Sequence, residues 1–282
     1  MHLSPKARHR LAAGAVISAV AVAVPGVAMA ATPGFTAPTT TGPSGTVSTD
    51  PGSPAPGQGP AAHTATGIGS ELRSCTATTF STAQQAVEQA ISDRLTTIGK
   101  LQSTTAKATS LSAADGAALN AMLAAELHSF DGAGLTGLQS TVQAETTCSQ
   151  VRASAKTMVT GFRVYVLAVP QVRATIAVDA GTARAAKITV DLPKIQARIA
   201  KAAQSNKDVA AAQQAFNDLQ TQVTTATNAL STVSVSQLLA QAPADYPADE
   251  SQLQADVSAV KTAVSAWKAA RSDLSTIRSA LR

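Results

Sequence analysis

The sequence contains few aromatic and few charged residues, and most of its excess positive charge lies at the very start. Phe, Trp and Tyr make up 3% of the 282 residues, and Asp, Glu, Lys and Arg make up 14%. The chain has 22 Lys and Arg against 17 Asp and Glu, but three of the basic residues lie in the first ten, which leaves 19 against 17. Nucleic-acid binding needs a concentrated basic surface and, for single strands, aromatic side chains that stack on bases. We therefore expect no nucleic-acid partner.

Histidine is scarce as well, and this argues against a metal or catalytic centre. Three of the four histidines lie within the first 63 residues, which leaves His128 as the one histidine in the rest of the chain. A protein metal site usually combines several His, Cys or acidic ligands. We expect neither a metal nor a cofactor, and no catalytic residues.

Two short motifs resemble those of enzymes but lack the surroundings that the chemistry needs. Residues 132–137 read Gly-Ala-Gly-Leu-Thr-Gly, yet a dinucleotide-binding loop follows a strand, and here a helical pattern precedes the glycines. Ser258–Lys261 and Ser265–Lys268 match Ser-x-x-Lys, but the other elements of penicillin-recognising enzymes are absent from the sequence. We interpret the first motif as a break between helices and the second as an exposed helix face, and we expect a protein that is not an enzyme.

The sequence has one long apolar run, and it lies at the start. Residues 1–30 combine three basic residues, an apolar run from Leu11, and Ala28-Met29-Ala30, which is the pattern of a cleaved secretory signal peptide. The alternative is an uncleaved anchor, because Leu11–Ala30 is long enough to cross a bilayer. We expect cleavage after Ala30 and no integral membrane segment afterwards, and hence a secreted or envelope-associated protein on the extracellular face.

Residues 31–69 contain seven of the thirteen prolines, together with many Thr, Ser and Gly residues. Such a composition buries too little apolar surface to offset the entropy lost on ordering. We predict a disordered spacer, with glycosylation of its Ser and Thr residues as an alternative role.

Residues 70–282 are rich in alanine, and their apolar residues recur at spacings of three and four, which predicts helices. The three best-delimited helices cover about 78–110, 171–203 and 249–281. One stripe runs from Leu135 to Phe162, another from Ile188 to Ala202, and the most regular from Val209 to Val233. We predict an all-α domain over 70–282: an elongated antiparallel bundle of coiled-coil-like hairpins. The stripe at 209–233 is expected to serve either internal packing or self-association.

The two cysteines are expected to form a structural disulfide, because exported proteins keep such bonds. The midpoint between Cys75 and Cys148 lies at residues 111–112, where Ser112 and Asp115 mark the start of a helix. In an antiparallel hairpin with its turn there, the two cysteines lie side by side at the same distance from the turn. This holds provided that the chain does not reverse direction at Gly132–Gly137. The alternative, a redox-active pair, usually has Cys-x-x-Cys spacing.

Residues 162–170 suit a strand by composition, but no partner strand is predicted, so we expect a helix that is bent or broken at Pro170. Asp179 falls on the apolar stripe of Val172 and Ile176. We expect it to form an ion pair with Arg163, Arg173 or Arg184 that fixes the helix register, with a ligand contact as the alternative.

The segment Arg163-Val164-Tyr165-x-Leu167-x-x-Pro170, the later Asp179, and Asp245-Tyr246-Pro247 before a long final helix resemble a group of exported helical proteins of unknown function from high-GC Gram-positive bacteria. The resemblance covers about residues 78–282. It implies an all-helical fold in an envelope or extracellular setting and supplies no reaction, cofactor or ligand. Arg163, Tyr165 and Asp179 are therefore structural candidates.

From these observations we expect a non-enzymatic structural or protein-interaction protein of the cell envelope, acting on an unknown protein partner or by self-association. The alternative is a carrier that holds a small apolar ligand or a lipid between its helices. Peripheral contact with the envelope is a further alternative, although a net charge of +2 for residues 31–282 attracts anionic lipid weakly.

Overall fold

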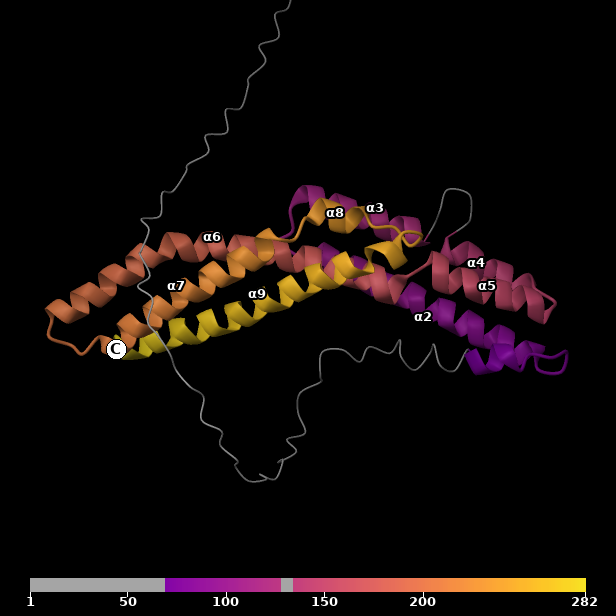
Figure 1. The fold of residues 1–282 in the computed structure, drawn as a ribbon, viewed down its shortest axis with the longest axis horizontal. Helices are drawn as coiled ribbons and strands as arrows, with labels where there is room; N and C mark the ends of the chain where they lie inside the picture. Colours follow the sequence, from indigo (N-terminus) through magenta and orange to yellow (C-terminus); the bar gives the residue numbers. More distant parts are fainter. Residues whose placement is uncertain (1–68, 128–133) are drawn as a thin grey trace, which may run out of the picture. The chain divides into compact units, whose positions relative to one another are not determined.

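The computed structural model describes residues 69–127 and 134–282, and throughout these ranges the regular structure is helical, as the sequence predicted. The signal, almost all of the spacer, His128 and Gly132 lie outside the described residues. The elements, shown in Figure 1, are α2 (Phe80–Lys107), α3 (Ala113–Leu127), α4 (Leu135–Ala144), α5 (Cys148–Gly161), the π-helical turn η1 (Val164–Ala168), α6 (Val169–Gln204), α7 (Ala210–Ser231), α8 (Val235–Ala240) and α9 (Tyr246–Ala280).

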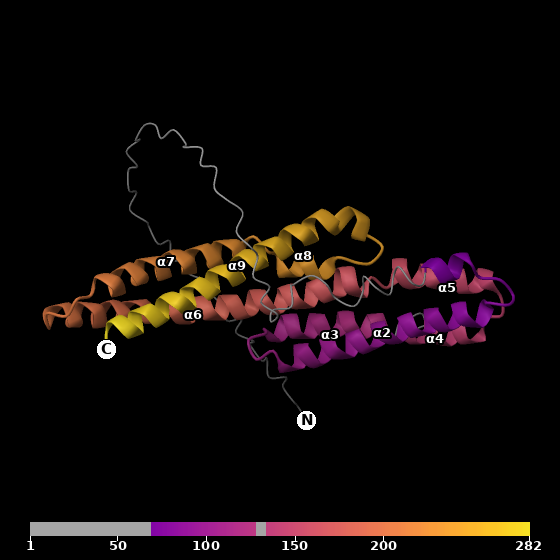
Figure 2. The same ribbon diagram turned by 90° about the horizontal axis from the view of Figure 1, so that it is seen from below.

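The first hairpin has α2 as one arm and α3 followed by α4 as the other. These two helices lie in succession along α2 (Figure 2). Near the end of α4 the carbonyl of Val142 accepts a hydrogen bond of 2.6 Å from Gln84 near the start of α2, so the arms are antiparallel. Cys75 and Cys148 form a disulfide, with their Cα atoms 5.9 Å apart. The chain therefore keeps its direction from α3 to α4, as the cysteine spacing predicted.

The stripe from Leu135 to Phe162 does not form one helix, which corrects the sequence analysis. The chain reverses between Ala144 and Cys148. Thr147 accepts a hydrogen bond from the backbone N–H of Gln150, and the Gln150 side chain accepts one from the backbone of Thr147. This reciprocal capping box starts α5, and the Thr-x-x-Gln signal for it is present in the sequence.

Residues 164–170 are helical, but the break does not come at Pro170. Phe162 and Arg163 leave the helical path after α5, η1 follows, and Pro170 lies in the first turn of α6. A proline fits there because the first backbone N–H groups of a helix have no intrahelical acceptor. The proline thus marks the start of a helix, where the sequence analysis expected a bend or break.

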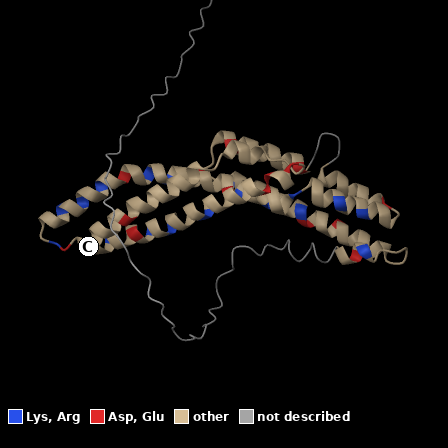
Figure 3. Cartoon of the chain, in the orientation of Figure 1, with Lys and Arg blue, Asp and Glu red and all other residues tan. Residues whose placement is uncertain are grey.

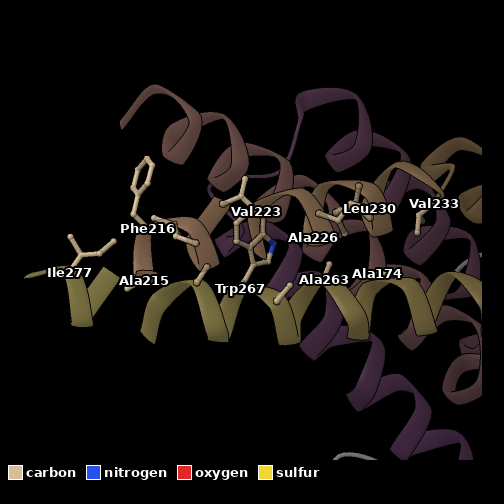
Figure 4. Close-up of a cluster of buried hydrophobic side chains, with 14 of the residues drawn as sticks. Ala174, Ala215, Phe216, Val223, Ala226, Leu230, Val233, Ala263, Trp267 and Ile277 are labelled. Carbon is tan, nitrogen blue, oxygen red and sulfur yellow. The ribbon is translucent and has the colours of Figure 1, made fainter. Parts of the chain in front are cut away.

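Two buried clusters hold the helices together, and α6 contributes to both. The first contains Leu119, Leu123 and Met158 among the side chains of α2 to α5, with Val172 from the beginning of α6. The second joins α6, α7, α8 and α9. Its centre, shown in Figure 4, is the seam of α7, whose apolar residues Ala212, Phe216, Leu219, Val223, Ala226 and Leu230 are all buried. The regular stripe at 209–233 therefore packs internally, chiefly against α9.

Gly181 allows α6 to pass close to α7 and α9. A Cβ atom at this position would overlap the side chain of Leu230 and lie 3.2 Å from Nε1 of Trp267. Glycine in a helix interior costs roughly 0.5–1 kcal/mol relative to alanine. Here that cost is offset by the close approach of the three helices.

Replacing Gly181 with alanine is expected to lower the free energy of unfolding by about 1–3 kcal/mol, because the added methyl group forces Leu230 and Trp267 to move. Gly99 is the matched control, since a Cβ there meets nothing within 4 Å. Gly99→Ala is expected to raise stability by roughly 0.5–1 kcal/mol. Urea denaturation followed by circular dichroism measures both changes. Equal stabilisation by the two substitutions would show that α6 does not need a glycine at this crossing.

Candidate functional site

A groove of about 840 Å³ lies between the second half of α6 and the end of α9. Its floor is apolar and consists of Ile188, Ile195, Ala202, Leu274, Ile277 and Leu281. Small-molecule sites have volumes of roughly 300–1,000 Å³ and are lined mainly by apolar side chains with a few polar groups that orient the ligand. The groove fits this description in both volume and lining.

The groove exists because the apolar stripe on α6 is only partly covered. The apolar stripe of α7 packs against α9 along most of its length, so the apolar side chains of these two helices bury one another. Beyond Gly181, the side chains of Ile188, Leu192 and Ile195 are half-buried, whereas Ile199 is fully buried. The regular stripe that the sequence shows at 188–202 therefore keeps apolar surface open to a ligand.

Basic side chains form the rim. From α6 come Lys187, Lys194, Arg198 and Lys201, from the following turn Lys207, and from the end of the chain Arg278 and Arg282. The four residues on α6 are spaced by seven, four and three positions, which places them along one side of the helix. Figure 3 shows Lys and Arg positions in blue along α6 and α9.

Among the residues that the structure describes, Asp191 is the only one with an acidic side chain that lines the groove. Its carboxylate lies 2.8 Å from Nζ of Lys194, and the hydrogen bond from this ammonium holds the pKa of Asp191 below its usual range. Among residues 69–127 and 134–282 no other ion pair is formed, so Arg198, Lys201 and Arg278 have no acidic partner there. The rim has a surplus of positive charge.

The helix dipoles account for part of this charge. The last turns of α6 and α9 contain Lys201 and Arg278, and a cation is favoured beside the roughly half negative charge at a helix C-terminus. That effect falls off within the last turn. It does not explain Lys194 or Arg198, whose like charges four positions apart repel each other on an isolated helix.

The groove combines an apolar floor with charged groups that could bind a ligand. Among the described residues that line it, the side chains of the kinds used as a base or a nucleophile are Asp191, Ser205 and four lysines, and none is a His, Cys or Tyr. In the part of the chain that the structure describes, no three His, Cys, Asp or Glu side chains lie close enough to hold a metal ion. The lysines and serines of the two Ser-x-x-Lys motifs are exposed on α9, outside this groove.

The candidates from the sequence lie elsewhere and connect helices. Arg163 donates a hydrogen bond of 2.9 Å from Nε to the carbonyl of Pro243, and its guanidinium lies 4.7 Å from the centroid of the Tyr246 ring. The guanidinium of Arg94 lies over the ring of Tyr165, 5.2 Å from the ring centroid. These cation–π contacts attach the residue before η1 to the start of α9 and η1 itself to α2.

Asp179 does not form the expected ion pair with an arginine. Its Oδ2 accepts a hydrogen bond of 2.6 Å from the backbone N–H of Ser112, just before α3. Ser112 in turn accepts a hydrogen bond of 3.0 Å from the backbone N–H of Asp115, as a capping residue does. Burial raises the pKa of Asp179, and the hydrogen bond from Ser112 opposes that rise. Asp179 therefore connects α6 to the beginning of α3.

The groove residues were not among those predicted from the sequence. The basic spacing at 187–201 was visible beside the apolar stripe, but a helical surface with this pattern is usually solvated. Its significance depends on the end of α9, some 75 positions later in the chain, lying next to it.

None of the helices that the structure describes is both long enough and apolar enough to cross a membrane. Comparisons of the chain with protein-family models, with curated proteins and with solved structures gave no match.

Proposed function

We propose that this protein is an exported, non-catalytic binding protein that carries a small amphipathic molecule in the groove between α6 and α9. The observation that supports this proposal is the groove itself. Ile188 and Ile195 in its floor are half-buried, and Arg198, Lys201 and Arg278 on its rim have no acidic partner among the described residues. A ligand with an apolar part and a polar part satisfies both features at once.

The protein-interaction role expected from the sequence has less support. The seam at 209–233 was the best candidate for self-association, and its apolar residues are buried between α7 and α9. Among residues 69–127 and 134–282, the large apolar side chains that are exposed are distributed over η1 and three different helices, namely Val159, Val166, Val190 and Val264. Single exposed apolar residues are ordinary on a protein surface and do not define an interface.

The exported setting rests on three features of the chain. Residues 1–30 have the pattern of a secretory signal, and residues 31–69 have the composition of a spacer. The disulfide between Cys75 and Cys148 persists in an oxidising compartment and is rare in the cytosol. A carrier outside the cytoplasm needs a rigid body that shields apolar surface from water, and a helical bundle provides one.

The test is binding of Nile red, a neutral dye that becomes fluorescent in apolar surroundings, to the full exported chain. Binding is expected, and Ala202→Trp is expected to weaken it at least about tenfold, because the indole would fill the half-buried floor position. Ala200→Trp is the control, since Ala200 is exposed on α6 and does not line the groove. Absence of dye binding, or equal binding by the two variants, would refute the proposal.

A further inference from the structure

The class of the ligand follows from the charge and length of the groove, and this inference rests on the proposed function. We propose that the groove binds an anionic amphiphile with a single alkyl chain, such as a fatty acid. The chain would lie on the apolar floor, and the acidic head would lie between Arg198 and Lys201 of α6 and Arg278 of α9.

The floor has the length of one alkyl chain. Ile188 and Ala202 are 14 positions apart on α6, which is about 21 Å at 1.5 Å per residue. The hydrocarbon core of a bilayer is about 30 Å thick, so the chain of one leaflet spans about 15 Å. A chain of this length fits along the floor and leaves room at one end for a head.

The volume is sufficient for one chain and its head. If a methylene occupies about the volume of a water molecule, roughly 30 Å³, sixteen carbons need about 480 Å³. The groove has about 840 Å³, so it accommodates a single chain with its head.

The rim requires a negatively charged head. Arg198 lies four positions after Lys194 and three before Lys201, so like charges crowd this side of α6. An anion between the two helices would relieve that repulsion, and arginine can hold a carboxylate through two parallel hydrogen bonds. A neutral head would leave the cations as they are, and a cationic head would be repelled.

A nucleic acid fits these observations less well. Its phosphates would occupy the rim, but its bases would meet Ile188, Ile195 and Leu281 in place of aromatic side chains. Base stacking on aromatic residues provides much of the affinity in single-strand sites. None of the described residues that line the groove is aromatic. An alkyl chain matches this floor, and a row of bases does not.

The test compares three probes that share one chain and differ in head charge: dodecanoate, dodecanol and dodecyltrimethylammonium. Calorimetric titration of the full chain with each probe, below its micelle concentration, gives the affinities. We expect dodecanoate to bind at least about tenfold more tightly than dodecanol, because charge-assisted hydrogen bonds to the head are gained. Dodecyltrimethylammonium and acetate, which lack the acidic head and the chain respectively, are expected to show no measurable binding.

Two charge-reversal variants locate the site. Arg198→Glu combined with Arg278→Glu is expected to weaken dodecanoate binding at least about tenfold. Lys268→Glu combined with Arg271→Glu makes the same change in net charge at exposed positions of α9 outside the groove, and is expected to leave binding unchanged. All four positions are exposed, and thermal melts of both variants verify that they are folded.

The outcomes separate the two proposals. Equal binding of dodecanol and dodecanoate would overturn the anionic ligand while the carrier function stands. Unchanged dodecanoate binding by the Arg198 and Arg278 variant would overturn the site, and acetate binding as tightly as dodecanoate would overturn the role of the chain. If neither Nile red nor any dodecyl probe binds, both proposals fail.

Discussion

Replacing Cys75 and Cys148 with alanine is expected to lower the free energy of unfolding by about 4 kcal/mol. The disulfide closes a loop of 73 residues, and in the loop-entropy description this constraint removes conformations from the unfolded chain. Alanine is preferred to serine because Cys75 is buried, and a hydroxyl there would add a cost of its own. Urea denaturation of the oxidised parent and of the double variant measures the difference.

The variant is nevertheless expected to fold. Arg152 of α5 donates a hydrogen bond of 2.8 Å from Nε to the carbonyl of Leu72, and one of 3.3 Å from Nη2 to the carbonyl of Cys75. These bonds hold the segment before α2 against α5 without the disulfide. A reducing agent should destabilise the parent by the same amount and leave the double variant unaffected. Identical denaturation midpoints for the oxidised parent and the variant would contradict the prediction.

Replacing Glu126 with glutamine is expected to stabilise the protein above pH 7 and to have little effect near pH 4. Burial near the end of α3 raises the pKa of Glu126 from 4.5 to about 7, and its buried Oε2 atom has no hydrogen-bond partner among the described residues. The folded state thus binds a proton more tightly than the unfolded state. The stability from this proton is full below about pH 4.5 and is lost as the pH rises through 7.

The size of the effect follows from the shift. Each pKa unit corresponds to about 1.4 kcal/mol, so the ionised carboxylate costs about 2–3 kcal/mol above pH 7 after allowance for its partial contact with water. Glutamine has a similar shape and no charge, so it removes this dependence. Urea denaturation at pH 5, 6, 7 and 8 measures it, with Glu250→Gln, at an exposed position of α9, as the control. Parallel stability curves for the parent and Glu126→Gln across this range would contradict the prediction.

Much of the helical architecture could be predicted from the sequence because the apolar spacing is regular and alanine-rich. The helices expected at 78–110, 171–203 and 249–281 correspond to α2, α6 and α9, and each boundary lies within three residues of the prediction. The cysteine spacing also predicted the direction of the chain through α3 and α4. In both cases the signal lies in local periodicity or in a simple length comparison.

Two helix starts have signals in the sequence, but other patterns in the same segments favoured a different prediction. The apolar spacing of Leu135, Val142 and Val151 continues across the turn between α4 and α5. This continuity favoured one uninterrupted stripe over the helix start that the Thr147 and Gln150 capping box indicates. Pro170 suits the first turn of a helix as well as the end of one, and the sequence does not decide between these positions.

The groove and the partner of Asp179 were not predictable because both depend on contacts between distant parts of the chain. Asp179 meets Ser112, 67 positions earlier, at a backbone N–H that carries no side-chain signal. The groove needs the end of α9 beside the basic side of α6. Such a pairing depends on which seams are already covered, and here α7 covers α9 and leaves α6 partly open.

The crossing at Gly181 has a practical consequence for observing this protein. Trp267, the single tryptophan of the chain, lies buried there, with its indole N–H lacking an acceptor among the described residues and the guanidinium of Arg184 5.8 Å from its ring centroid. An indole in such dry surroundings emits at shorter wavelength than one in contact with water. The unmodified chain therefore contains a built-in optical reporter, and its emission will shift to the red whenever α6 moves away from α9 far enough to admit solvent.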